Sequence, residues 1–488
     1  MKQDSIALLP LDNRPVSYLL PKQIADFSGI NLILPERKCL GDLKCGSDLD
    51  YIDRWLKDTV ETYGHTSLTL IISLDSFIYG GLVQSRKHDL SLEELKNRCR
   101  GMPWHVSTVE TYGFSSIMRI PNYNNSDEEK DYWKDYGEKI FKWSELTHKV
   151  GDKNAVASRD LPLLIEDWYQ SSKEIPSNII ADYKAHREKN LTVNILWLES
   201  LHESCFEYLI FSCDDSGKYG MNVVEAEYIK KQIKNHNFLN KVKVLSGTDE
   251  IPLILLTKAV LKKSVYKPSV SLYFNSVEGK NQLARYESNT IYNSVLNQIE
   301  TLGVEVKDFK DSEIALFVHC ADSVQGDHIF KVNPSYTKNN ANELIKVLEK
   351  SDKPFVLFDL AYANGADPNL IEALLSSKMN MDKCYGYSGW NTCSNSIGSA
   401  LAIGINRWIA EKGKSFDELA FKKCLLTRFL DDYAYQAKIR HKKVTEKEVN
   451  EKMKPYVKRF LELLNLNNIE IQFKLPWKRA FEIEVKIN

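Results

Sequence analysis

The sequence predicts an α/β fold built on mainly parallel β-sheets. Three observations carry this prediction: short apolar runs recur along the chain, each run ends in polar residues, and a segment of helical character follows most of them. Runs of consecutive apolar residues are typical of strands that are buried on both faces of a parallel sheet. Strands that alternate with helices define the α/β class.

The expected strands form two series. The first series comprises residues 6–11, 30–34, 68–74, 116–120, 208–211 and 242–245. The second series comprises residues 270–274, 313–318, 355–358 and 384–387. The order of elements in the second series predicts a flavodoxin- or Rossmann-like unit. For the first series the pattern is compatible with an open sheet or with a (β/α)8-type barrel, which could extend over most of both series.

The chain is expected to divide at the basic, proline-containing stretch 262–268. The predicted regions are an α/β domain, a second α/β domain and a C-terminal region, over residues 1–264, 265–411 and 412–488. The first domain carries a helical insertion at about 126–190, because a polar N-cap and acidic residues open a long helical segment there. Asp367, followed by proline, is expected to begin a helix in the second domain.

The character of the chain changes after about residue 411. Residues 411–436 and 446–464 have the apolar spacing of amphipathic helices. Residues 469–473 and 481–487 alternate apolar and polar side chains, which predicts a small antiparallel hairpin.

Composition excludes several classes of protein. The 488 residues are 43% hydrophobic and 27% charged, ordinary values for a globular protein of several domains. The 65 basic and 66 acidic residues leave no overall field for nucleic acid or an anionic membrane. The N-terminal apolar stretch is too short for a signal peptide, and no run reaches the length of a membrane span. With nine scattered cysteines and no CxxC pair, a cytoplasmic protein with reduced thiols is expected, without a nucleic-acid or membrane partner.

Polar and aromatic residues follow almost every expected strand. In parallel α/β sheets, ligands bind beyond the carboxyl ends of the strands. Carboxylates, amides and arginines there can hold sugar hydroxyls, and flat aromatic rings can stack on sugar faces. The candidates for substrate binding are Asp12, Arg14, Asp75, Tyr79, Arg86, Arg119, Asn122, Tyr219, Asp359, Asn364, Trp390 and Asn391.

Structural roles compete with ligand binding at several of these positions. Asp12 can form a turn in which Arg14 pairs with it, and Asp75 can cap a helix. Arg119 can be a structural ion-pair partner. A histidine at a strand end, such as His319, is more often a hydrogen-bonded core residue than a ligand.

Two adjacent acids, Asp214 and Asp215, follow the run that ends near Phe211. A turn beyond the strand can bring both carboxyl groups toward one ligand, and like charges held close raise the pKa of one of them. Glycoside hydrolysis uses two carboxyl groups of unequal pKa. Asp214 and Asp215 are therefore the candidate catalytic residues, although Asp214 could instead cap the following turn while Asp215 is solvated.

Other chemistries find less support in the sequence. No phosphate-binding GxxxxGK[ST] loop, GxGxxG fingerprint, GxSxG elbow or HExxH motif occurs. No cofactor is expected, and the alternative is a divalent-metal hydrolase or lyase whose ligands would come from Asp12, Asp75, His319, Asp322 and Asp359. A second alternative is a two-lobed sugar-binding protein that catalyses nothing.

Five motifs resemble a bacterial family of domains of unknown function, the one numbered 4127. They read LLPLDNRP, SLDSFIYGGLVQSR, SIMRIPNYN, SCDDSGKYG and GYSGWNTCSNSIG, and the similarity covers residues from about 5 to 410. The resemblance implies a cytoplasmic bacterial protein linked to carbohydrate use, and it supplies no mechanism. Asn13 stands where the family is expected to carry Asp more often, which weakens any catalytic role for that position.

These inferences lead to one expected function. The chain is expected to be a glycoside hydrolase that acts on a small glycan containing an N-acetylated amino sugar. Asp215 would be the general acid, and Asp214 would orient the acetamido group or stabilise the cationic transition state. Asp75, Arg119 and Asn391 would hold hydroxyls, with Tyr219 and Trp390 as stacking platforms.

Overall fold

The computed structural model describes residues 4–65, 67–102, 109–121, 130–152, 154–155, 157–336, 340–440 and 444–487. The chain forms two compact units, and each is described by itself. The first unit comprises Met1–Asn13, Leu32–Thr248 and Tyr286–Ser288. The second unit comprises Arg14–Asn31, Asp249–Arg285 and Asn289–Asn488, so the C-terminal residues group with the second sheet.

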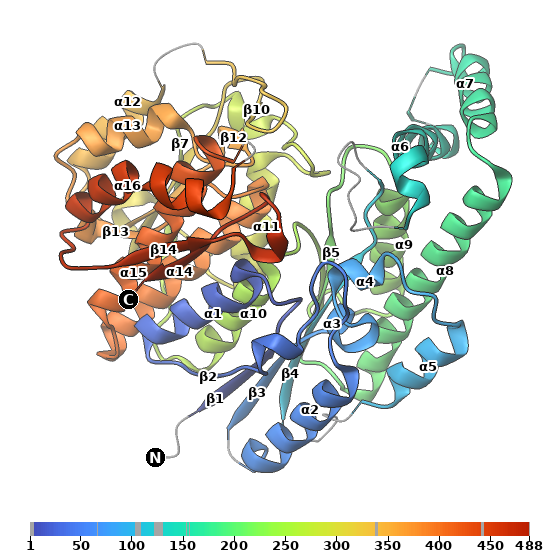
Figure 1. The fold of residues 1–488 in the computed structure, drawn as a ribbon, viewed down its shortest axis with the longest axis horizontal. Coiled ribbons are helices and arrows are strands. Elements are labelled where there is room, and N and C mark those ends of the chain that lie inside the picture. The colour runs from blue at the N-terminus through green and yellow to red at the C-terminus, as the bar shows by residue number, and fades with distance from the viewer. Residues whose placement is uncertain are drawn as a thin grey trace. The chain divides into compact units, whose positions relative to one another are not determined.

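A six-stranded sheet forms the centre of the first unit (Figure 1). Its strands are β1 (Ser5–Leu9), β2 (Asn31–Ile33), β3 (Leu68–Ser73), β4 (Glu110–Ile117), β5 (Tyr208–Cys213) and β6 (Val242–Ser246). The spatial order is β2-β1-β3-β4-β5-β6, and the pairings from β1 through to β6 are parallel. The sheet therefore has two ends and is open, so the barrel alternative is wrong.

Helices follow the strands of the first unit as the alternating pattern predicts. They are α2 (Leu49–Tyr63), α3 (Leu74–Tyr79), α4 (Leu82–Ser85), α5 (Leu92–Arg100), α6 (Tyr132–Gly151), α7 (Leu161–Lys173), α8 (Ser177–Glu199) and α9 (Met221–Asn235). The expected helical insertion corresponds to α6, α7 and α8, between β4 and β5. Within it, α8 packs against α5, β4 and α9 (Figure 1).

The second unit contains a five-stranded sheet. Its strands are β7 (Ser269–Phe274), β8 (Glu305–Val306), β9 (Ile314–His319), β11 (Phe355–Asp359) and β13 (Cys384–Ser388). The spatial order is β13-β11-β9-β7-β8, and its pairings are parallel. Counted along this unit the order is 2-1-3-4-5, which confirms the flavodoxin-like prediction. The strands of the first sheet follow the same order, with β6 added at the far edge.

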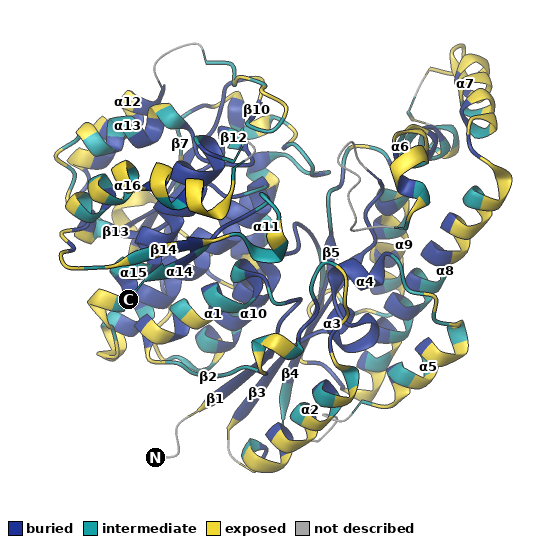
Figure 2. Cartoon of the chain, in the orientation of Figure 1, coloured by how far each residue is buried: buried dark blue, intermediate teal, exposed yellow. Residues whose placement is uncertain are grey.

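The helices of the second unit enclose an apolar core. They are α1 (Pro15–Ser28), α10 (Ile251–Lys263), α11 (Ile291–Leu302), α12 (Asn340–Lys350), α13 (Pro368–Ser376) and α14 (Cys393–Gly413). The core is lined by buried side chains such as Leu316, Phe358 and Leu401. Asp367 caps α13 as predicted, because its side chain accepts a hydrogen bond from the backbone N–H of Asn369 at 2.9 Å. Figure 2 shows that the central strands of both sheets are mostly buried, whereas the edge strand β2 is half-buried and the edge strand β8 is exposed.

The C-terminal part contains the predicted helices and hairpin. The helices are α15 (Glu418–Arg428), a π-helix over Phe429–Ala437 and α16 (Glu446–Leu463). Strands β14 (Ile471–Lys474) and β15 (Glu484–Ile487) pair antiparallel. The short strands β10 (Gly326–Asp327) and β12 (Tyr362–Ala363) form a separate parallel pair. Single 3-10 turns span Arg37–Cys39, Ser200–Glu203, Gly279–Asn281, Phe309–Asp311, Met381–Lys383 and Pro476–Lys478.

The fourth strand lies earlier in the sequence than predicted. The expected run was 116–120, but β4 spans Glu110–Ile117 and buries Thr111, Ser115 and Ser116. These polar residues hide the strand from a search for apolar runs. Arg119 therefore belongs to the loop beyond the strand, where its side chain can turn toward the next strand.

Two further features of the whole chain can be stated. In the part of the chain that the structure describes, no helix combines the length and the apolar character needed to cross a membrane. All nine cysteines are free thiols, and seven of them are buried.

Candidate functional site

The adjacent aspartates lie directly beyond the carboxyl end of β5, and each pairs with a different arginine. Asp214 pairs with Arg86 Nη2, and Asp215 Oδ2 lies 2.8 Å from Arg119 Nη1. The side chains of Asp214 and Asp215 are 17% and 25% exposed, whereas those of the arginines are 5% and 7% exposed. The acids therefore reach solvent from a support of two buried guanidinium groups. We call these four residues the twin-aspartate cluster.

The backbone explains how consecutive residues reach different partners. Neighbouring side chains on a strand point to opposite faces, but β5 ends at Cys213. Asp215 then adopts a φ of 40°, in the left-handed region that a non-glycine residue occupies at a cost of about 1–2 kcal/mol. This turn directs Asp214 to Arg86, at the end of α4, and Asp215 to Arg119, in the loop after β4.

The two acids have unequal electrostatic surroundings. Burial and the charge of Asp214 raise the pKa of Asp215, and the guanidinium groups of Arg119 and Arg86 oppose the rise. Asp214 has Arg86 as its direct partner, which stabilises the negative charge on its carboxylate. Asp215 therefore keeps its proton to a higher pH than an ordinary aspartate does.

Asp75 lies behind the cluster and is 1% exposed. Its two carboxylate oxygens accept hydrogen bonds from the backbone N–H and the hydroxyl of Ser116, both at 2.8 Å. Burial raises its pKa to about 6. The cap of α3 is Ser73, whose hydroxyl accepts from the N–H of Ser76, so the cap role considered for Asp75 is wrong. The carboxylate of Asp75 joins the start of α3 to β4, and its burial gives no support to direct contact with a substrate.

Tyr79, another predicted site residue, belongs to a buried aromatic stack. Its ring lies 4.7 Å from the ring of His88, which in turn lies 4.3 Å from the ring of His186. Nε2 of His88 is 2.9 Å from Asn190 Oδ1, and Nε2 of His186 is 3.0 Å from the carbonyl oxygen of Ser85. The Nδ1 atoms of both histidines are buried and have no hydrogen-bond partner among the residues that the structure describes. The stack therefore holds two neutral imidazoles against each other.

The paired histidines make the first unit sensitive to acid. Burial lowers the pKa of His88 to about 4, and burial with the charge of His88 lowers the pKa of His186 to about 3. An unfolded histidine titrates near pH 6.5, so the stabilisation is complete above that pH and is lost as the pH falls toward 4 and 3. We expect the free energy of unfolding to drop between pH 7 and pH 5, and the drop to be about 2 kcal/mol smaller in His88→Gln. Urea unfolding at both pH values measures this, with the exposed His202→Gln as the control. Equal drops in His88→Gln and wild type would contradict the assignment.

Tyr219 lies at the rim of the turn that follows the twin aspartates. Its ring meets the ring of His148 edge-on at 5.3 Å, and Lys149 Nζ and Lys218 Nζ lie 5.1 Å and 5.2 Å from its centroid. The backbone N–H of Gly220 donates to His148 Nδ1 at 3.1 Å. The C-terminal end of α6 thus fixes the turn, and Tyr219 remains partly exposed. Asn122 lies outside the described residues.

The remaining predicted residues, apart from Asp12, belong to the second unit. Arg14 donates to Asp249 at 2.5 Å and 3.4 Å, and its guanidinium lies 5.5 Å from the ring of Trp477. Asp12, in the first unit, is buried at the end of β1. The predicted residues are thus divided between two units, and the twin-aspartate cluster is the group that the first unit brings together.

Residues around β11 and β13 form a buried scaffold. Asp359 accepts hydrogen bonds from the N–H of Asp367 at 2.9 Å and from the hydroxyl of Tyr387 at 3.4 Å, and burial raises its pKa to about 7. The N–H of Asn364 donates to the carbonyl of Asn391 at 2.7 Å. Trp390 is 1% exposed, so it cannot stack on a substrate in this conformation.

His319 is a hydrogen-bonded core residue, the role that is more common than ligand binding for a histidine at a strand end. It is fully buried, and its Nε2 lies 2.8 Å from Asp367 Oδ2. Burial opposes protonation, but the hydrogen bond and charge of Asp367 outweigh it and raise the pKa of His319. Among the described residues, no three His, Cys, Asp or Glu side chains are arranged to hold a metal ion. The geometry therefore gives no support to the metal-dependent alternative.

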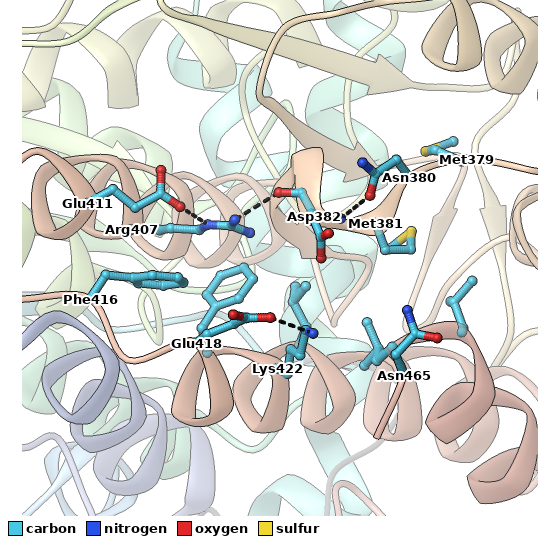
Figure 3. A pocket seen from close by; sticks show the side chains of 14 residues that line it. Met379, Asn380, Met381, Asp382, Arg407, Glu411, Phe416, Glu418, Lys422 and Asn465 are labelled. Carbon is cyan, nitrogen blue, oxygen red and sulfur yellow. Dashed lines mark hydrogen bonds and ion pairs between the residues drawn. The ribbon is translucent and has the colours of Figure 1, made fainter. Parts of the chain in front are cut away.

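A pocket of about 470 Å³ lies in the second unit and is lined by none of the predicted site residues (Figure 3). Two of its basic side chains bond to other groups of the wall. Arg407 Nε donates to Glu411 at 2.9 Å, and the other guanidinium nitrogens donate to the carbonyls of Cys384 and Asp382. Lys422 pairs with Glu418 at 2.6 Å. Arg407 and Lys422 are thus each engaged by a neighbouring acid of the wall.

The sequence search missed the residues of α8 that surround the cluster. The side chains of Tyr183, Arg187, Asn190 and Asn194 are all nearly fully buried. They recur at helical spacing, and that spacing of polar residues on one face was the signal that could have found them. A buried helix face that is polar cannot be recognised from the spacing of apolar residues alone.

Comparison with known proteins tests the family. The searches of curated proteins and of solved structures find no match. A family model does match, and it extends the similarity noted for residues 5–410 through the C-terminal hairpin. The chain belongs to the family described as "Protein of unknown function (DUF4127)", whose model matches residues 6–486.

Proposed function

We propose that this chain is a glycoside hydrolase whose acid pair is Asp215 and Asp214. One observation carries the proposal: two adjacent, partly exposed carboxyl groups stand at the carboxyl end of a parallel strand, with unequal electrostatic surroundings. Unequal carboxyl groups at one site are what general-acid cleavage of a glycosidic bond requires. The proposed substrate is a small glycan that contains an N-acetylated amino sugar.

The proposed reaction divides the work between the two acids. Asp215 gives its proton to the glycosidic oxygen as the bond from that oxygen to C1 breaks. Asp214, as a carboxylate supported by Arg86, orients the acetamido group, whose carbonyl oxygen attacks C1 in place of an enzyme nucleophile. A water molecule then adds to C1 and releases the acetamido oxygen, and the carboxylate of Asp215 takes up the proton of that water.

A screen of candidate substrates, run on the wild-type protein and on Asp214→Asn, tests this proposal. We expect turnover of aryl glycosides of N-acetylated amino sugars, and loss of that turnover in Asp214→Asn, because an amide cannot stabilise the positive charge that develops at C1 and on the acetamido group. Hydrolysis of a panel of aryl glycosides, with and without the acetamido group, measures both.

Asp53→Asn is the matched control. Asp53 lies on α2 in the same unit and pairs with Arg98 at 3.1 Å, so its variant also removes one aspartate from an arginine partner. It should retain wild-type turnover. The proposal fails if Asp214→Asn hydrolyses the best substrate at the wild-type rate, or if the wild-type protein binds glycans and hydrolyses none of them.

A further inference from the structure

The buried face of α8 contacts the backbone of the segments that carry the twin-aspartate cluster. Polar side chains on this face donate to backbone carbonyl groups at the end of α4, near the end of β4 and in the loop after β4. Asn194 Nδ2, for example, donates to the carbonyl of Ser116 at 3.2 Å and its Oδ1 accepts from the hydroxyl of Ser115 at 2.7 Å.

The first contact fixes the residue before Arg86. Nε2 of His186 lies 3.0 Å from the carbonyl oxygen of Ser85, and Asn190 Nδ2 donates to the same oxygen at 2.7 Å. Asn190 Oδ1 is in turn 2.9 Å from Nε2 of His88. The carbonyl of Ser85 therefore has two side-chain donors from adjacent turns of α8, and Arg86 follows it directly.

The second contact fixes Arg119 itself. Arg187 Nη2 donates to the carbonyl of Met118 at 2.7 Å, and Arg187 Nη1 donates to the carbonyl of Arg119 at 3.0 Å. The same guanidinium holds Glu225 through Nε and Nη2, both at 2.6 Å. Glu225 belongs to α9, the helix that begins just after the twin aspartates. Arg187 therefore joins the segment that carries Arg119 to the helix that follows Asp215.

We propose that α8, through His186, Arg187 and Asn190, is the positioning element that holds Arg86 and Arg119 against the twin aspartates. The helical insertion is then part of the site, although none of these three side chains touches a substrate. Its effect on catalysis rests on the proposed function, whereas its effect on the two arginine–aspartate pairs does not.

The fixed geometry of a guanidinium explains why arginine serves at position 187. Its planar fork presents several N–H groups at once, and here they reach two carbonyls and one carboxylate. A lysine keeps the charge beside Glu225 but has one nitrogen, which cannot serve three acceptors in different directions. Loss of the carbonyl contacts frees the loop after β4, and Arg119 with it.

The experiment uses pairs of variants that separate positioning from folding. Arg187→Lys removes the fork and keeps the charge. His186→Leu removes the donor to Ser85, and His186→Gln restores an N–H donor at that position. Arg98→Lys is the matched control, because Arg98 also bonds a carboxylate and a carbonyl, those of Asp53 and Phe77, in the same unit.

The titration of Asp215 is the readout, and it requires no substrate. In protein labelled with 13C at the aspartate carboxyl carbons, the Asp215 signal is identified by its absence from Asp215→Asn. Both arginines oppose the raised pKa of Asp215, so their displacement moves the titration to higher pH. We expect this in Arg187→Lys and His186→Leu, and wild-type titration in His186→Gln and Arg98→Lys. Wild-type titration in a folded His186→Leu or Arg187→Lys protein overturns the inference.

A kinetic measurement adds the catalytic consequence. If the wild-type protein hydrolyses a glycoside, His186→Leu should lower kcat on the order of 100-fold with little change in KM, because misplaced groups near the reacting atoms cost rate more than binding. Unchanged kcat in that variant also overturns the inference. If the wild-type protein hydrolyses no glycoside, the proposed function fails, and the Asp215 titration still decides the role of α8.

Discussion

Asp215→Asn is expected to lower kcat about 100- to 10,000-fold on a glycoside with a poor leaving group. The amide keeps the shape of the side chain but has no acidic proton to give to the departing oxygen. Asp215 is 25% exposed and its pKa is raised, so the protonated form persists to a higher pH than in an ordinary aspartate. Steady-state hydrolysis of alkyl or oligosaccharide substrates measures the loss.

The leaving group distinguishes a general acid from other roles. A dinitrophenolate departs without protonation, so Asp215→Asn should act on a dinitrophenyl glycoside with kcat/KM near that of the wild type. Its kcat should still fall, because Asp215 also takes up the proton of the water that adds to C1. Asp214→Asn should lose rate on both substrates, because orientation of the acetamido group precedes departure of either leaving group. Equal losses for Asp215→Asn on both substrates would contradict the general-acid assignment.

The dependence of kcat/KM on pH is a second test of Asp215 as the general acid. A general acid must be protonated, so kcat/KM should fall as the pH rises through the pKa of Asp215 in the free enzyme. Because burial and Asp214 raise that pKa, the fall should lie above the pH at which an ordinary aspartate ionises. On the dinitrophenyl substrate this alkaline fall should disappear.

Arg187→Met is expected to lower the free energy of unfolding of the first unit by about 3–5 kcal/mol. The methionine fills similar space but leaves the carboxylate of Glu225, 12% exposed, without its partner. It also leaves the carbonyls of Met118 and Arg119 without their donor. Breaking a buried pair costs more than the pair contributed, because one desolvated charge remains.

Arg98→Met is the control for that measurement. Arg98 pairs with Asp53 in the same unit, but the two side chains are 21% and 35% exposed. Water screens an exposed pair and replaces its hydrogen bonds, so a loss of about 1 kcal/mol is expected. Urea unfolding followed by circular dichroism compares the two variants. A loss from Arg187→Met that is no larger than the loss from Arg98→Met would contradict the buried role of Arg187.

Most strands could be predicted from the sequence, because a strand that is buried on both faces is a run of consecutive apolar residues. Leu68–Ser73 and Tyr208–Cys213 are runs of apolar residues with polar residues directly beyond them. The polar strand Glu110–Ile117 shows where this reasoning fails. Its serines are buried because they meet partners from distant segments, Asp75 and Asn194, and no local pattern records such partners.

The candidate site could be located in part. Asp214 and Asp215 stand at the end of β5 as expected, since a strand end is set by where the apolar run stops. Trp390 was expected as a platform and is instead buried. The prediction failed because the sequence around Gly389 and Trp390 does not indicate whether the Trp ring faces solvent or the core. Tyr219 keeps a partly exposed position.

The α/β class, the two strand series, the C-terminal hairpin and the position of the twin aspartates could be predicted from the sequence, because each depends on burial and spacing within a few residues. The partners of those aspartates could not be predicted, because they come from distant parts of the chain. Arg86 lies 128 residues from Asp214, and Arg119 lies 96 residues from Asp215. The strand order β3-β4-β5 and the buried polar face of α8 bring them together. Such pairings depend on which strands become neighbours, and that is settled by the packing of the whole unit.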